Sequence, residues 1–372
     1  MNLKTVIIFI FAAFAINETT SQKDVNPEGE ILESLVPNFN KLSRVRPVSR
    51  ENVSAPVLVS VKLYVRDIRI QELDNEYSVQ LTFRQQWSDE RLSYSSRDSS
   101  RPYVSLINSQ NEIWQPDTFF GNEIDGGKYH DLMMRNQYIR ISPDGTVLKS
   151  VRISLRLSCP MIYWYFPFDK QTCSLRFASY GFTKRDLVFV WRAADPVLTS
   201  FEINSHPFFL EDSSTDYCDA QTNTGTYSCL RVDFLFQRVP RSYIVTVYIP
   251  TMMTVITSWV SFWITPKAVT ARTLVATLTL FVLAIQTAEA NKTFPQISYT
   301  KAVDKWTGTC LTFVFAALLE FVAVHSLLNR KEKNNLISKL ESLAHRFDVV
   351  SRIAFPVLFV LFNICYWMAY YF

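Results

Sequence analysis

The chain has 372 residues, of which 48% are hydrophobic and 14% aromatic, and its formal net charge at pH 7 is +4. This mild charge is spread along the chain and gives no indication of a nucleic-acid partner. The four histidines are scattered and no glycine-rich phosphate loop occurs. The sequence therefore indicates no metal site, no cofactor and no enzyme.

Residues 1–21 have the pattern of a secretory signal peptide: Lys4, the apolar run VIIFIFAAFAI, then small and polar residues. The mature chain therefore enters an oxidising compartment. Asn52 begins an Asn-Val-Ser sequon and is the predicted glycosylation site. The sequons at Asn17 and Asn291 are weaker, because one borders the signal peptide and the other lies close to the membrane.

The chain has six cysteines. Cys159 and Cys173 enclose the aromatic stretch CPMIYWYFPFDKQTC, and a disulfide between them would contribute roughly 3 kcal/mol by closing the loop. A second bridge is predicted between Cys218 and Cys229. Cys310 and Cys365 lie in apolar stretches and are predicted to be free thiols. So many aromatic residues in a short loop indicate that the loop packs against another apolar surface.

From about residue 57 to 240, short alternating runs separated by turns predict an all-β sandwich or barrel. The remainder contains four apolar stretches, each long enough to cross a bilayer of ~30 Å. Arg272, Gln286 and Glu289 make the second stretch the least certain, and such residues usually face a bundle interior or water. The four predicted spans are residues 243–264, 268–290, 306–328 and 349–371.

A cleaved signal places the β domain outside the cell, so the links 264–268 and 329–348 are cytoplasmic. The second link is rich in Lys and Arg, as the positive-inside rule requires. Its apolar residues recur at helical spacing, so we predict one amphipathic helix that packs on the membrane or on neighbouring helices: Leu336, Leu340, Leu343 and Phe347. The alternative is that this helix is a docking site for a cytosolic protein.

Several motifs then identify a family resemblance: CPMIYWYFPFDKQTC, YIPTMMTVITSWVSFW, PDTFFGNE, FASYGF, GTVLKSVRISLRLSCPM, TDYCDAQTNTGTYSCLR and FAALLEF. Together with the signal and the four spans, they resemble a subunit of the pentameric Cys-loop ligand-gated ion channels, and among these the invertebrate glutamate-gated chloride channels. The implied fold is an extracellular all-β sandwich followed by a transmembrane four-helix bundle. The implied domains are residues 1–21, 22–240, 241–328, 329–348 and 349–372.

The resemblance also implies the setting of the protein. We expect L-glutamate as the agonist, chloride as the permeant ion and a homo- or hetero-pentamer of related subunits in the lipid bilayer. The expected location is the plasma membrane, as a multi-pass and postsynaptic protein. In that family the Cys159–Cys173 loop lies under the sandwich and couples ligand binding to the gate. The coupling residues of this loop are Phe166, Pro167, Phe168 and Asp169, and we expect the first three to contact the link 291–299.

Two arginines stand out in the alternating strands. Arg66 and Arg84 each lie on the polar side of a strand, and a turn with its midpoint at residue 75 would make them cross-strand neighbours. Two arginines placed opposite each other repel unless an anion lies between them. The alternative is that each finds a neighbouring glutamate or water.

The resemblance extends this pair to a ligand site. It implies Arg66, Arg84 and Ser150 on one subunit face and Ser179, Tyr180, Thr224 and Tyr227 on the opposite face. Arginines and hydroxyls would hold the carboxylates. Tyr180, Tyr227 and either Phe119 or Phe120 would surround the ammonium group.

The second span predicts a pore of unusual composition. Helical spacing places one face at Thr270, Leu274, Leu278, Phe281, Ile285 and Glu289, where relatives usually have Pro, Thr, Thr and Leu at the first four positions. Rings of apolar side chains gate by dewetting. Arg272, preceded by Ala271, and the outer Lys292 would favour chloride, although Glu289 opposes it. A rotated helix would instead line the path with Thr273, Thr277 and Ala284.

Three functions were compared on this basis. A soluble binding protein is excluded by the four spans. A glutamate-gated chloride channel subunit is supported by the pocket, the coupling loop and the spans. The alternative is a poorly conducting modulatory or obligate heteromeric subunit that keeps its ligand pocket, which the apolar pore face favours.

Overall fold

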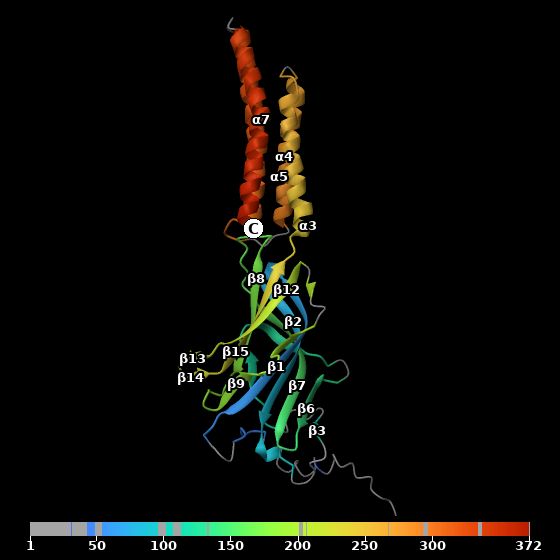
Figure 1. Cartoon of the computed structure of the whole chain (residues 1–372), viewed down its shortest axis with the longest axis vertical. Helices are drawn as coiled ribbons and strands as arrows, with labels where there is room; N and C mark the ends of the chain where they lie inside the picture. The colour runs from blue at the N-terminus through green and yellow to red at the C-terminus, as the bar shows by residue number, and fades with distance from the viewer. Residues whose placement is uncertain are drawn as a thin grey trace, which may run out of the picture.

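The computed structural model describes residue 31 and residues 43–48, 54–95, 102–106, 113–131, 134–200, 204–205, 207–266, 268–292, 297–333 and 337–371. The predicted signal peptide and the sequons at Asn17 and Asn52 lie outside these ranges. The described chain consists of a β domain and a helical bundle placed end to end (Figure 1).

The larger sheet of the β domain has eight strands. Its order is β10-β1-β2-β7-β6-β3, with β5 paired to β7 and β9 paired to β1. The strands are β1 (Val57–Gln71), β2 (Glu76–Ser88), β3 (Val104–Leu106), β5 (Glu123–Tyr129), β6 (Gln137–Ile141), β7 (Thr146–Ser158), β9 (Leu187–Trp191) and β10 (Val197–Thr199).

The second sheet has five strands in the order β11-β12-β15-β8-β4, and a separate two-stranded hairpin joins β13 to β14. The strands are β4 (Thr118–Phe120), β8 (Lys170–Ser179), β11 (Asn204–Ser205), β12 (Phe208–Tyr217), β13 (Ala220–Thr222), β14 (Gly225–Tyr227) and β15 (Cys229–Arg238). Two short 3-10 helices, η1 (Glu72–Asp74) and η2 (Glu90–Leu92), follow β1 and β2.

Alternation along the strands explains how the two sheets pack. In β1, Val59, Val61 and Leu63 are fully buried, whereas the residues between them are at least partly exposed. Successive side chains of a strand point to opposite faces, so one face of each strand enters the core between the sheets. The predicted all-β sandwich is confirmed.

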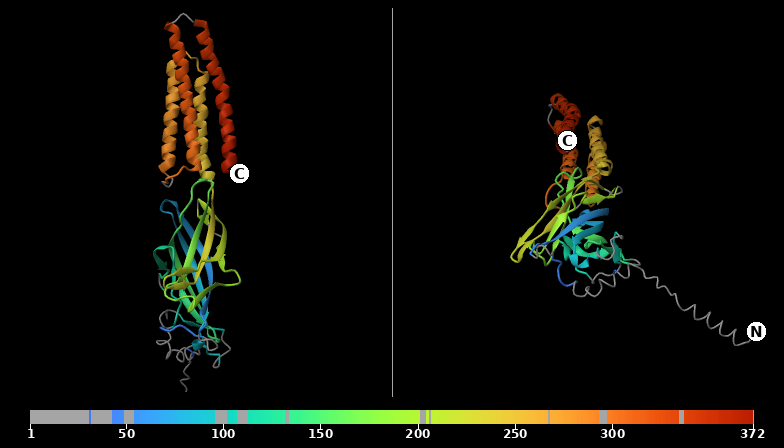
Figure 2. Two further views of the ribbon diagram at one scale, coloured as in Figure 1. Left: turned by 90° about the vertical axis from the view of Figure 1, so that its left-hand side faces the viewer. Right: turned by 60° about the horizontal axis from the view of Figure 1, so that its bottom comes forward.

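Four helical segments are long and apolar enough to span a membrane: Arg241–Trp263, Val269–Lys292, Ala302–Leu328 and Ser342–Tyr370. The first comprises α3 (Arg241–Tyr243), the π-helical turn η3 (Ile244–Tyr248), α4 (Ile249–Trp259) and η4 (Val260–Trp263). The others belong to α5 (Val269–Lys292), α6 (Ala302–Lys333) and α7 (Ile337–Tyr370), which form a bundle with the first (Figure 2). The predicted four-helix bundle is confirmed.

The predicted link 329–348 is not a separate helix. Helix α6 continues to Lys333, and α7 begins at Ile337 and runs without a break into the fourth span. No glycine or proline occurs between Ile337 and Phe355, so nothing in the sequence ends the helix there. The C-terminal end of α7 lies beside the β domain (Figure 1).

Candidate functional site

One face of the larger sheet presents a row of polar side chains across three strands. Arg84 of β2 lies directly opposite Ser150 of β7 and, on its other side, opposite Lys62 of β1. Directly opposed residues have Cβ atoms ~5 Å apart. Arg84 and Ser150, which the family resemblance assigned to one subunit face, are therefore neighbours in the structure.

The predicted cross-strand pairing of Arg66 with Arg84 is wrong. Val65 pairs with Leu81 and Asp67 with Gln80, so Arg66 is the extra residue of a β-bulge. Its Nε donates a hydrogen bond to Oγ1 of Thr82 at 3.0 Å. Arg66 and Arg84 share one face of the sheet, but Arg84 pairs with Lys62, four residues before Arg66 along β1.

Three arginines of β2, β6 and β7 keep a buried donor without an acceptor among the described residues, the Nε atoms of Arg84, Arg140 and Arg152. Leaving a buried donor unpaired costs ~1–3 kcal/mol. Nη2 of Arg152 donates to Oε1 of Gln80 at 2.9 Å, so this guanidinium is only partly paired. The face therefore has more cationic donors than acceptors, which is the chemistry of an anion site.

His130, which follows β5, reports the electrostatic potential of the same region. Its Nε2 lies 3.0 Å from Nε2 of Gln80 and 2.9 Å from Oγ of Ser154. Burial and the positive charges of Arg152 and Arg66 lower the pKa of His130. The region thus disfavours a further positive charge and favours a negative one.

The second group of predicted ligand residues begins at the end of β8. The ring of Tyr180 is 79% exposed and meets Phe119 of β4 edge-on, with ring centroids 5.6 Å apart. Phe120 instead packs against Phe83 and Phe177 in the core. The structure therefore selects Phe119, and not Phe120, as the aromatic neighbour of Tyr180.

The hydroxyl of Ser179 makes hydrogen bonds within its own subunit. It donates to Asp117 at 2.6 Å and accepts from the backbone N–H of Phe182 at 2.9 Å, and the residue is only 2% exposed. Asp117 also accepts from the N–H of Gly181 at 2.6 Å. The Ser179 hydroxyl thus holds the turn that presents Tyr180. No role was predicted for Asp117, although it lies in the motif PDTFFGNE.

Thr224 and Tyr227 belong to the β13–β14 hairpin, and their hydroxyl oxygens lie 2.9 Å apart. The predicted disulfide between Cys218 and Cys229 joins the strands on either side of this hairpin, and its presence is confirmed. A short cross-linked hairpin keeps both hydroxyls together at an exposed site.

The two predicted groups of ligand residues do not meet within one subunit. Among the described residues, no hydrogen bond, ion pair or ring contact joins the arginine group of the larger sheet to the group of Tyr180, Thr224 and Tyr227. One copy of the chain presents half of the contacts on each face. A complete site therefore requires two copies side by side.

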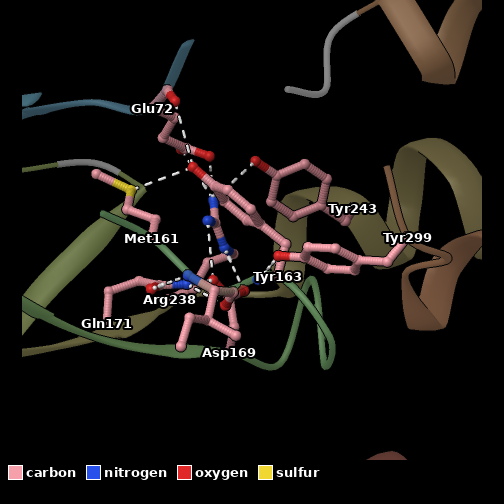
Figure 3. A network of polar contacts seen from close by, with 9 residues as sticks. Glu72, Met161, Tyr163, Asp169, Gln171, Arg238, Tyr243 and Tyr299 are labelled. Atoms are coloured by element: carbon pink, nitrogen blue, oxygen red, sulfur yellow. Dashed lines mark hydrogen bonds and ion pairs between the residues drawn. The ribbon is translucent and has the colours of Figure 1, made fainter. Parts of the chain in front are cut away.

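A buried network lies under the sandwich (Figure 3). Nε of Arg238 donates to Oδ1 of Asp169 at 2.7 Å, and Nη1 donates to both carboxylate oxygens of Glu72 at 2.8 Å. Burial opposes the charged form, but the hydrogen bond and the charge of Asp169 raise the pKa of Arg238 above its ordinary value. Sequence reasoning selected Asp169 but missed Arg238 and Glu72.

The loop closed by the Cys159–Cys173 disulfide docks on the helical bundle, and this bridge is also confirmed. The backbone N–H of Tyr163 donates to the hydroxyl of Tyr299 at 2.9 Å, and Trp164 stacks on the same ring with centroids 4.2 Å apart. The N–H of Ala302 donates to the carbonyl of Trp164 at 3.1 Å. The loop therefore contacts both the 291–299 link and the start of α6.

The rings of Phe166 and Phe168 contact the helical bundle, whereas residues 293–296 of the link lie outside the described residues and the predicted contacts with them stay a prediction. The ring of Phe166 packs on Tyr243, with centroids 5.0 Å apart, and the ring of Phe168 packs on Trp367 and Tyr371 at 5.7 and 5.6 Å. These partners belong to the first and fourth spans and their ends. The apolar rings enter the bundle because aromatic partners are available there, whereas the link contributes Tyr299 to the polar side of the loop.

Comparison with known proteins identifies this architecture. The family model of the neurotransmitter-gated ion-channel ligand binding domain matches residues 28–240, and that of the transmembrane region matches residues 247–342. The chain belongs to the neurotransmitter-gated ion-channel family. It is 38% identical to a glutamate-gated chloride channel of Drosophila melanogaster over 443 aligned residues, covering 98% of this chain and 97% of the relative. The chain is thus a multi-pass channel subunit and not an enzyme.

The second helix of the channel subunit, α5, buries one stripe against the other helices: Arg272, Ala276, Thr279 and Leu283. Leu274 and Phe281 lie on the opposite side and are 64% and 63% exposed. Thr273 and Thr277 are also exposed, but their hydroxyls donate to the helix's own carbonyls, those of Val269 and Thr273. Both proposed pore faces are therefore exposed in the single subunit, and the apolar face lies opposite the buried stripe.

Arg272 does not face the ion path in this channel subunit, which corrects the expected ring of arginines. Its residue exposure is 1%, and its Nη1 and Nη2 donate to the carboxylate of Asp348 in α7 at 3.0 and 2.8 Å. Its Nε donates to the carbonyl of Ile264 at 2.9 Å. The charge of Arg272 is thus compensated inside the subunit. At the other end of α5, Lys292 forms an ion pair with Glu289 at 2.6 Å.

Proposed function

We propose that this protein is a subunit of a glutamate-gated chloride channel. The observation that carries the proposal is the face on which Arg84 lies opposite Ser150 and keeps a buried, unpartnered donor. A carboxylate supplies two acceptor oxygens and matches an arginine fork. A neutral or purely cationic transmitter would leave these donors unmatched. The full-length similarity to a glutamate-gated chloride channel supports the same agonist.

The agonist would bind between two subunits. Arg66, Arg84 and Ser150 of one copy would hold the carboxylates. Tyr180 and Tyr227 of the neighbouring copy, with Phe119, would surround the ammonium, since aromatic faces attract cations. Thr224 would add a hydroxyl at the hairpin. Ser179 would act through the turn that positions Tyr180.

Five copies would close around α5, with Thr270, Leu274, Leu278, Phe281, Ile285 and Glu289 on the ion path. Because Arg272 is compensated by Asp348, the proposal of chloride selectivity rests on the relative and on the absence of a carboxylate at the inner end of α5. The similarity to a channel along the whole chain favours a conducting pore over a purely modulatory subunit.

We further place the protein in the plasma membrane of a postsynaptic cell, in a homo- or hetero-pentamer with related subunits, and glycosylated at Asn52. A pentamer of this family brings opposite faces of neighbouring copies together, as the divided ligand site requires.

Whole-cell recording from cells that express the full chain tests the proposal. Glutamate is expected to evoke a current whose reversal potential follows the chloride gradient. Co-expression with a related subunit covers the heteromeric case. A current evoked only by an amine transmitter would overturn the agonist assignment, and a reversal potential that follows sodium would overturn the ion assignment.

A further inference from the structure

A cavity of about 250 Å³ lies inside the β domain, between the two sheets. Its wall combines polar groups with an apolar part that includes Phe83, Val151, Ile153 and Leu155. Phe119 and Tyr129 also line it and are 40% and 48% exposed, so the cavity communicates with the surface. This is close to the lower end of the ~300–1,000 Å³ range typical of small-molecule sites.

Lys149 is the cationic residue in this wall. It lies on the inward side of β7, in the same row as the buried Val147 and Val151, and pairs across the ladders with Gln85 and Ile139. The amide of Gln85 is already used, because it donates to Oγ1 of Thr118 at 2.6 Å. An inward lysine in a row of valine and isoleucine is unexpected for packing alone, since lysine is almost never buried unless it is paired.

The ammonium group of Lys149 has no hydrogen bond or ion pair with any described residue. Burial lowers its pKa to about 8, and no charged neighbour contributes to the shift. Glu123 and Tyr129 are the other titratable groups of the wall, and neither is paired with the amine. The cavity therefore holds a cation that is largely protonated at neutral pH and lacks a counterion.

We propose that this cavity binds a small monocarboxylate with an apolar body. The carboxylate would pair with Lys149, and the hydrocarbon part would lie against Phe83, Val151 and Ile153. The agonist itself does not fit this chemistry, because Lys149 is the one cationic residue among those that line the cavity and the wall offers no cationic partner for a second carboxylate. The site is separate from the arginine face, which lies on the other side of the larger sheet.

The position of the cavity indicates how an occupant would affect the channel. Phe119 lines the cavity and contacts Tyr180 edge-on at 5.6 Å. Its strand, β4, pairs with β8 immediately before Tyr180, through Thr118 with Ser179. An occupant that moves Phe119 would change the aromatic surface presented to the agonist. This modulatory step rests on the proposed function, whereas binding to the cavity does not.

Direct binding to the purified full-length protein in detergent, without glutamate, tests the site. Hexanoate is the probe, and hexanamide is its neutral counterpart of nearly equal size. We expect hexanoate to bind and hexanamide to bind roughly tenfold or more weakly, because hydrogen bonds to charged groups are the stronger ones. Lys149→Met should remove the preference for hexanoate, and Lys128→Met, at an exposed position of β5, should retain it.

A pH series on the unmodified protein keeps the test independent of the variant's folding. Hexanoate stays ionised throughout, so its affinity should fall as the pH rises from about 7 to about 9.5 and Lys149 loses its proton. Equal binding of hexanoate and hexanamide, or unchanged hexanoate binding in Lys149→Met, would overturn the proposal. Absence of a glutamate current, both alone and with a related subunit, would reject the proposed agonist without affecting this binding result.

Discussion

Arg84 and Arg238 carry the same guanidinium group in opposite surroundings. All three nitrogens of Arg238 donate to the carboxylates of Asp169 and Glu72, and its plane lies over the ring of Phe208 at 4.2 Å. Arg84 has a buried Nε with no acceptor among the described residues and a lysine opposite it in the ladder. A fully paired arginine holds two parts of the protein together, whereas a partly paired one is available to a ligand.

Arg272 follows the pattern of Arg238, because Asp348 and the Ile264 carbonyl satisfy its donors inside the subunit. Whether a cationic group joins two elements or stays available to a ligand therefore depends on its partners and not on its place in the sequence. Arginines at the ends of the helical bundle join elements, and those on the sheet face have donors to spare. The substitutions that follow change either a fully paired arginine or a cation that has an unpaired donor.

The largest effect is expected when the buried ion pairs of Arg238 are removed. Arg238→Met would leave the carboxylates of Asp169 and Glu72 buried without their cation, and breaking a buried pair in this way costs ~3–5 kcal/mol. We expect a large loss of thermal stability and of protein at the cell surface, measured by thermal unfolding of the purified protein and by surface labelling.

The matched control is Arg69→Met. Arg69 forms an exposed ion pair with Asp67, and such pairs contribute ~0–1 kcal/mol. An equal loss of stability in the two variants would show that the burial of Arg238 carries no special weight.

The next largest effect is expected at Arg84, whose Nε has no acceptor among the described residues. Arg84→Ala should weaken glutamate binding by ~2–5 kcal/mol, the range for truncating one partner of a buried charge pair. Thermal stability without agonist should be unchanged or slightly higher, since an unsatisfied donor is removed. Agonist binding and thermal unfolding of the same preparation check both expectations. Lys62→Ala, in the same row of the sheet, is the control and should retain most of the affinity, and equal weakening there would assign the effect to the general charge of the face.

The sequence predicted the sandwich because the alternation of Val59, Val61 and Leu63 is a local signal. It predicted the helices and the aromatic loop for the same reason. It did not predict the register at Arg66, because the ladder closes with Gln71 opposite Glu76 and shifts once more at the bulge, and neither feature leaves a trace in the alternation. It also placed Arg272 in the pore, because the partner Asp348 is distant in sequence and only the packing of α7 on α5 brings the two together.

The direction in which a hydroxyl group points is likewise not predictable from the sequence. Family resemblance assigned Ser179 to the ligand through a motif, but a motif does not show which way a hydroxyl points. In the structure Asp117, distant in sequence, takes that hydroxyl. Arg238 was missed because a single arginine at the end of a strand has no periodic signal, and its two carboxylates come from separate parts of the chain.

Lys149 offers a further test of an unpaired cation. Its folded pKa of about 8 lies below the ~10.4 of an unfolded lysine, so between these values the unfolded state binds more protons. Stability should therefore rise with pH in this window, by up to roughly 3 kcal/mol at ~1.4 kcal/mol per unit. Lys149→Met should be more stable than the unmodified protein at neutral pH, and the difference should shrink toward pH ~9.5. Thermal unfolding of both proteins across pH measures this, and a constant difference would mean that the amine is not desolvated.

The smallest effect is expected in the pore, where no charge is involved. Leu274, Leu278, Phe281 and Ile285 follow one another along about 16 Å of helix at 1.5 Å per residue. All four side chains are at least 46% exposed in the subunit, so five copies would place four apolar rings on the path and expel water. Changing both leucines to threonine restores hydroxyls, and we expect a several-fold larger glutamate current at equal surface expression. Thr277→Leu distinguishes the two helix orientations. If α5 is rotated so that Thr277 faces the pore, this substitution narrows and dries the ion path and reduces the current. If the leucine face lines the pore, the substitution leaves the current unchanged. Whole-cell currents from the two variants therefore decide which face of α5 conducts. A large current from the unmodified subunit, reduced by Thr277→Leu, would show that the threonine face lines the pore.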